Sequence, residues 1–226
     1  MIRYVTPLTG PWLAMLVALP HSVAAQTEPT IVWPSNLAVP FVVKHACPGE
    51  GCMLETGLAC SGITVYADPG TAAAVSELAY GDRVAITDGE VHISAPGRVA
   101  MVRAAEKPVR VAQRDSSPGQ HWSRDSVVRF AQTDTLYVLN YHGEGFFTVW
   151  HAGRFYKTEV FWPWESLHRR PDYQYDGRVL SERAATFWVN VRTADSVTGW
   201  IEVDYDVFKM SHYYVPASEL RCPPRR

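Results

Sequence analysis

The sequence lacks a charge excess of either sign. Its 226 residues carry 21 Lys and Arg against 23 Asp and Glu, for a net charge of −2. Nucleic-acid-binding surfaces are strongly basic, so no nucleic-acid partner is expected. It also has no G-x-S-x-G, no H-E-x-x-H, no phosphate-binding loop and no dinucleotide fingerprint. We therefore expect no cofactor, no metal site and no catalytic residue of a common class.

Long apolar runs are also missing. No stretch beyond the N-terminal region reaches the roughly 18 apolar residues of a membrane span. In residues 1–25, Arg3 precedes the apolar segment 12–19, and small residues at 23–25 precede Gln26. This order is typical of a cleaved signal peptide, with a buried N-terminal helix as the alternative. The mature protein is therefore expected to be exported, either to the periplasm or out of the cell.

Cysteine is scarce, with four in the chain. An even count in an exported protein favours disulfides, although sequence alone leaves three connectivities open. The favoured pairing is Cys47–Cys52 as a local clip and Cys60–Cys222 as a tie to the C-terminal segment. Zinc is the alternative, but the spacings of four and seven residues differ from the paired C-x2-C of structural zinc sites.

Alternating apolar and polar residues indicate β structure. The clearest case is 187–193 (FWVNVRT) followed by 199–204 (GWIEVD), two predicted strands joined by a polar turn. By their parity, Trp188 and Trp200 fall on the polar face of this hairpin. Turn signals recur elsewhere in the chain at the spacing of a β sandwich or barrel. The predicted fold class is all-β.

The segment 188–201 reads W-V-x-V-x7-G-W-I, and this pattern resembles the closing hairpin of bacterial SH3-like (SH3b-type) domains. Residues 63–103 contain a Pro-Gly loop, a Gly-Asp step and tight hairpins. This order also resembles an SH3-like domain, which would be an earlier copy of the same repeat. The resemblance implies two tandem five-stranded barrels. The predicted organisation is a signal peptide (1–25), an extended lead-in (26–46), a first SH3-like domain (47–105), a linker (106–125), a second SH3-like domain (126–208) and a C-terminal tail (209–226).

Aromatic residues concentrate in the predicted second domain. A barrel of about 80 residues cannot fully bury all of them, so some are expected to line a groove. The alternative is a core plus an interface between domains. The candidate ligand-binding residues are Tyr141, Glu144, Trp150, Trp162, Trp164, Trp188 and Trp200. The SH3-like resemblance implies a non-catalytic binding or scaffold module whose partner is a peptidoglycan peptide or an envelope protein.

Two other functions stay open at the level of sequence. One is a small envelope hydrolase with an unusual site near His142, Glu144 and His151, if strand pairing brings the two histidines together. These side chains are otherwise ordinary polar residues near a turn. The other is a structural partner that pairs its exposed strand edges with another chain.

Overall fold

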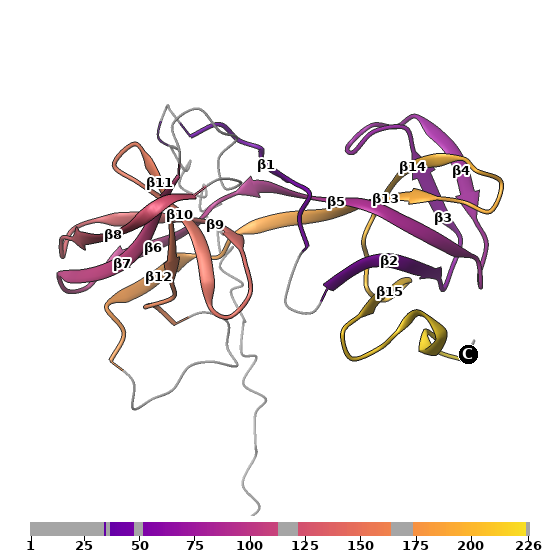
Figure 1. Cartoon of the computed structure of the whole chain (residues 1–226). Helices are drawn as coiled ribbons and strands as arrows, with labels where there is room; N and C mark the ends of the chain where they lie inside the picture. The colour runs from indigo at the N-terminus through magenta and orange to yellow at the C-terminus, as the bar shows by residue number, and fades with distance from the viewer. Residues whose placement is uncertain (1–33, 35–36, 48–51, 113–121, 164–173, 225–226) are drawn as a thin grey trace, which may run out of the picture. The chain divides into compact units, whose positions relative to one another are not determined.

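The computed structural model describes residues 34, 37–47, 52–112, 122–163 and 174–224, except the side chains of Ser123 and Arg124 (Figure 1). Every regular element in these ranges is a β strand, apart from the short 3-10 helix η2 (Ala217–Glu219). The predicted all-β class is therefore confirmed. The predicted signal peptide lies outside the described residues.

The strands form two sheets. Sheet A has eight strands in the order β15-β2-β5-β13-β14-β3-β4, with β1 paired to β5. Its strands are β1 (Phe41–Lys44), β2 (Cys52–Ala59), β3 (Ile63–Tyr66), β4 (Ala74–Leu78), β5 (Arg83–Ala95), β13 (Ala184–Arg192), β14 (Thr198–Glu202) and β15 (Phe208–His212).

Sheet B has seven strands in the order β12-β6-β9-β10-β11-β7-β8. They are β6 (Gly97–Met101), β7 (Ala105–Ala112), β8 (Trp122–Phe130), β9 (Thr135–Tyr141), β10 (Phe146–His151), β11 (Arg154–Glu159) and β12 (Gly177–Ser181). All seven come from one continuous stretch of chain. Sheet B is thus an insertion between β5 and β13 of sheet A.

This arrangement differs from the predicted division into residues 47–105 and 126–208. The hairpin β13–β14 pairs with β5 and β3 in sheet A, whereas β6 and β7 belong to sheet B. Alternation in the sequence identifies a strand and its buried face, but it does not identify the neighbouring strand. The SH3-like resemblance of residues 188–201 stays a prediction.

The predicted linker and tail also contain strands. Most of residues 106–125 lie in β7 and β8, which pair with each other. Pro108 is tolerated because the ladder between β7 and β11 runs from Val109 to Val111, just beyond the residue that lacks an N–H. In the predicted tail, β15 pairs with β2.

Both predicted disulfides are present, Cys47–Cys52 and Cys60–Cys222. The second joins the end of the described chain to residues just before β3. It therefore fixes the C-terminal segment against sheet A, where Leu220 is buried.

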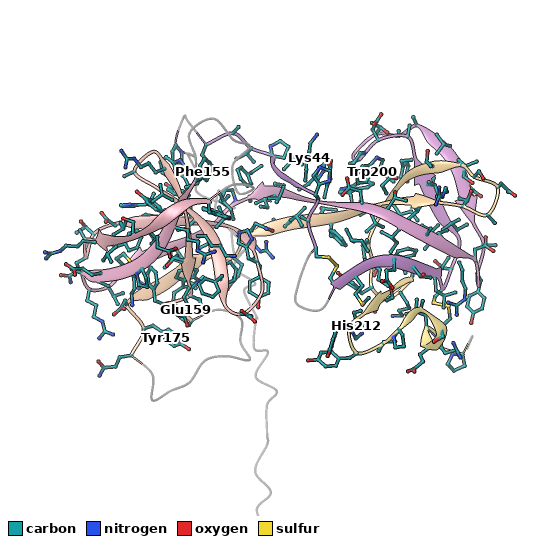
Figure 2. All side chains as sticks on the ribbon, in the orientation of Figure 1. Lys44, Phe155, Glu159, Tyr175, Trp200 and His212 are labelled. Carbon is teal, nitrogen blue, oxygen red and sulfur yellow. A yellow bond between two sulfur atoms is a disulfide. The ribbon has the colours of Figure 1, made fainter. Side chains whose placement is uncertain are left out.

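Two hydrophobic clusters form the core. The first contains most of the buried side chains of sheet A, and in it Val189 and Val191 of the central strand β13 are fully buried, as their alternation predicts. The second belongs to sheet B, where Phe130 and Phe147 are fully buried. Side chains from both sheets are drawn in Figure 2, with Trp200 labelled on sheet A.

Gly199, the second residue of β14, permits close packing against β3, so we predict that Gly199→Ala is destabilising. An added Cβ would lie 2.6 Å from the backbone oxygen of Tyr66 and 2.7 Å from Cγ1 of Val65. The backbone oxygen cannot move aside without disturbing β3, so a loss of about 1–3 kcal/mol is expected. Urea unfolding measures it. The matched control is Gly62→Ala, where nothing lies within 4 Å. Similar losses in both variants would contradict the packing explanation.

Candidate functional site

Three of the predicted ligand-binding tryptophans belong to the core. Trp150 is 8%, Trp162 2% and Trp188 6% exposed. The alternation places Trp188 on a polar face, but the rings of Tyr66 and His92 cover it, with centroids 6.2 and 6.3 Å away. Buried rings cannot stack on a ligand, so the predicted role of these three residues in binding is wrong.

The described residues among the other four do not form one surface, because they are divided between the two sheets. Tyr141 is half-buried against Phe147, with ring centroids 4.9 Å apart. Glu144 is exposed at the turn before β10, with a positive φ of 51°. Trp200 is half-buried on sheet A, opposite Tyr66 of β3. Trp164 lies outside the described residues.

The two histidines of the predicted hydrolase site do not converge. His142 lies opposite Phe146 at the start of β10, with its backbone N–H donating to the Phe146 carbonyl at 2.8 Å. His151 is the last residue of β10, about 17 Å further along at the usual rise per residue. Each ring has its own local partner: Nε2 of His142 lies 2.6 Å from Oγ1 of Thr148, and Nε2 of His151 lies 3.0 Å from Oδ2 of Asp134. A shared metal or catalytic site at these histidines is therefore not formed, and no cluster of three or more potential metal ligands occurs among the described residues.

A different site lies beside β15, the strand at the edge of sheet A that precedes β2 in the strand order. A cavity of about 670 Å³ opens there, and we call it the β15 groove. It is lined by Cys52, Tyr205, Lys209, Met210, Ser211, His212, Tyr214, Val215, Glu219, Leu220 and Arg221.

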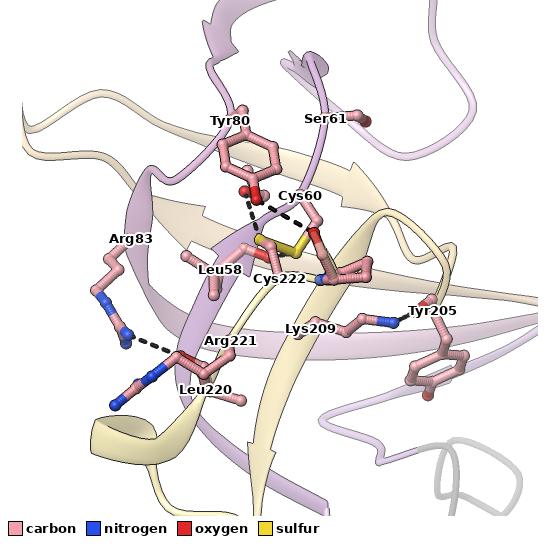
Figure 3. The surroundings of a disulfide bond; sticks show 12 residues. Leu58, Cys60, Ser61, Tyr80, Arg83, Tyr205, Lys209, Leu220, Arg221 and Cys222 are labelled. Atoms are coloured by element: carbon pink, nitrogen blue, oxygen red, sulfur yellow. Dashed lines mark hydrogen bonds between the residues drawn. A yellow bond between two sulfur atoms is a disulfide. The ribbon is translucent and has the colours of Figure 1, made fainter. Parts of the chain in front are cut away.

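The far wall of the β15 groove is the segment C-terminal to β15. The chain turns back at once, because His212 and Val215 exchange backbone hydrogen bonds of 3.0 and 2.9 Å. Arg83 then holds the returning segment by donating to the carbonyl oxygen of Ala217 at 2.7 Å. It also donates to the carbonyl oxygen of Leu220 at 3.0 Å (Figure 3). The Cys60–Cys222 disulfide closes the wall. Both sides of the groove are thus attached to sheet A.

The β15 groove combines exposed rings with two cations. Tyr205 is 52% and Tyr214 80% exposed. Lys209 donates to the carbonyl of Tyr205, and Arg221 donates to the carbonyls of Ser218 and Leu220. Neither cation forms an ion pair among the residues that the structure describes, and the groove has a single carboxylate, that of Glu219. It can therefore hold a flat or apolar group on the tyrosines and a negative group near Lys209 or near Arg221.

The sequence does contain a signal for this site. Because residues 209–226 are predicted to be a tail, Tyr214, Lys209 and Arg221 are not among the predicted binding residues. The favoured Cys60–Cys222 pairing, however, requires the segment before Cys222 to return to the folded domain. The segment that carries Tyr214 therefore has to return close to the domain.

None of the family models, curated proteins or solved structures compared with the chain matches it. Among the described residues, no helix has the length and apolar character needed to cross a bilayer. The sites themselves therefore carry the evidence on function.

Removing the disulfide that closes the β15 groove should destabilise the protein more than removing the short one. The Cys60–Cys222 loop spans 162 residues and the Cys47–Cys52 loop spans 5. In the chain-entropy account these loops contribute about 5 and about 2 kcal/mol. The double replacements Cys60→Ser with Cys222→Ser and Cys47→Ser with Cys52→Ser are compared by urea unfolding. A larger loss from the short loop would contradict this order.

The environment of His142 predicts a loss of stability in mild acid. Burial, followed by the nearby charge of Lys157, lowers the pKa of His142 to about 4. The unfolded chain therefore takes up a proton near pH 6.5 that the folded chain refuses until about pH 4. The contribution of His142 to the free energy of unfolding should fall by up to about 3 kcal/mol as the pH drops through this range.

The comparison of His142→Gln with His45→Gln tests whether His142 causes the loss of stability in mild acid. Glutamine can keep a hydrogen bond to Thr148 but does not titrate, so His142→Gln should remove the slope. His45 is 75% exposed, so its replacement should leave the slope intact. Urea unfolding at several pH values measures both, and equal slopes in the two variants would exclude His142 as the cause.

Proposed function

We propose that this protein is an exported, non-catalytic binding module that holds a carboxylate-bearing peptide, such as a peptidoglycan peptide, in the β15 groove. The observation that carries the proposal is the combination of two exposed tyrosines with Lys209 and Arg221 in one cavity. Tyrosine rings bind peptide groups with little loss of side-chain entropy, and cations without an ion pair favour a carboxylate.

Two further observations support export and the choice of ligand. Two disulfides are compatible with an oxidising compartment, where structural disulfides persist. The closing hairpin at 188–201 resembles SH3-like domains, a family in which cell-wall peptides are bound. The proposed groove lies on β15 and not on that hairpin, so the resemblance supports the class of ligand and not its position.

Adjacent tyrosines provide a matched test of the groove. Tyr213 and Tyr214 are 76% and 80% exposed, but only Tyr214 lines the cavity. The purified, oxidised protein is incubated with insoluble peptidoglycan, and the bound fraction is measured. Tyr214→Ala should weaken retention by about fivefold or more, because a ring that contributes over 1 kcal/mol is lost. Tyr213→Ala should leave retention near that of the wild type.

The cations give a second, independent readout. Lys209→Gln should weaken retention and also make it less sensitive to salt, since an exposed charge pair is screened by ions. If the wild type is not retained, the peptidoglycan ligand is wrong and an envelope protein becomes the partner to test. New cleavage products on the washed peptidoglycan, detected by mass spectrometry, would contradict the non-catalytic assignment.

A further inference from the structure

A second cavity, here called the Lys157 pocket, opens on sheet B. It has a volume of about 470 Å³. The residues that matter for its chemistry are Arg110, Asp125, His142, Glu144, Phe146, Lys157 and Glu159. None of them lines the β15 groove, so a ligand of this pocket is independent of the function proposed for that groove.

Strand pairing places two cations side by side in this pocket. Lys157 of β11 lies directly opposite Arg110 of β7 and directly opposite Thr148 of β10. Residues directly opposite each other in antiparallel strands project from the same face of the sheet. Lys157 and Arg110 are therefore neighbours on one face, opposite the face that packs Val109 and Tyr156 into the core.

Such a pair is unfavourable by itself. Like charges directly opposite each other destabilise a sheet. Burial and the charge of Arg110 lower the pKa of Lys157, and the carboxylate of Glu144 only partly offsets this. Nζ of Lys157 lies 5.5 Å from the centroid of the Phe146 ring, which is a weak contact, and no ion pair to Lys157 occurs among the described residues.

The carboxylate beside Arg110 does little to neutralise the pair. Asp125 accepts a hydrogen bond from Nε of Arg110 at 3.0 Å, but the two side chains are 84% and 58% exposed. Ion pairs this exposed are screened by water and contribute little. Arg110 and Lys157 therefore keep their charges side by side in a concave site, where a bound anion could contact both.

The rest of the pocket limits which anion fits. His142 is neutral at pH 7 because its pKa lies near 4, so it adds no third positive charge. Asp125, Glu144 and Glu159 are exposed carboxylates in the same lining, and they repel any anion, most strongly one with more than one charge. Phe146 and Pro108 supply apolar surface. A singly charged group attached to a small apolar body suits this set.

We propose that the Lys157 pocket binds a small carboxylic acid, with the carboxylate between Lys157 and Arg110. In this position the carboxylate would accept charge-assisted hydrogen bonds from both side chains. It would also turn an unfavourable pair of like charges into a favourable triad.

The probe for this site is N-acetylalanine, a monocarboxylate, with inorganic phosphate as the competing anion. Binding to the purified, oxidised protein is followed by NMR through the imidazole signals of His142 and the amide signal of Lys157. N-acetylalanine should shift both signals with saturation, and it should raise the pKa of His142, since a nearby anion favours the imidazolium. Phosphate should bind more weakly. Phosphate binding as tight as that of the carboxylate, or no saturable shift with either, would overturn the proposal.

Lys157→Gln separates a binding role from a structural one. Loss of this charge removes the repulsion with Arg110, so the Tm should stay the same or rise while the affinity for N-acetylalanine falls at least tenfold. The control is Arg154→Gln, which removes a cation from the first residue of β11, outside the lining of the pocket. It should leave the affinity for N-acetylalanine unchanged. Unchanged affinity in Lys157→Gln would overturn the proposal, and a lower Tm together with unchanged affinity would show that Lys157 is a structural residue.

Discussion

The pairing of β5 with β13 is the contact on which the rest of the molecule depends. It joins Arg83–Ala95 to Ala184–Arg192, with partners from Ala95 through Ala85. On one side of this pair β2 and β15 are added, and on the other β14, β3 and β4. Gly89 of β5 allows the segment after β1 to approach this pair closely, since an added Cβ would lie 2.4 Å from the backbone oxygen of Ala46. Because the two strands are far apart in sequence, everything between them must form as an insertion.

Features set by neighbouring residues, such as a strand and its buried face, could be predicted from the sequence. The pairing of strands that are far apart in the sequence could not. Alternation around Val189 and Val191 identified a strand and its buried face correctly. Cysteine spacing and compartment favoured the correct disulfide pairing. Strand partners were missed because alternation carries no information on which strand lies next in the sheet. Pro108 was misleading, since its position at the end of one ladder is visible only once β11 is known to be the neighbour.

The β15 groove was missed for a related reason. Tryptophans attract attention in a sequence, but their large apolar area favours burial, and Trp150, Trp162 and Trp188 all became core residues. The exposed rings are tyrosines close to the C-terminal end. Their position depends on the Cys60–Cys222 link and on the hydrogen bonds of Arg83. The Lys157 pocket depends on the registers of β10 with β11 and of β11 with β7, which no sequence pattern revealed.

The discontinuity of sheet A also sets an order of assembly during synthesis. The strands of sheet B are all present once Ser181 has been made, and their pairings lie within one continuous stretch. Strand β5 is made much earlier but lacks its partner β13 until sheet B is complete, and β2 lacks β15 for longer still. Sheet B can therefore fold first, while the first strands of sheet A wait with an unpaired edge. The β15 groove is the last feature to form, since Cys222 must emerge before its wall can close.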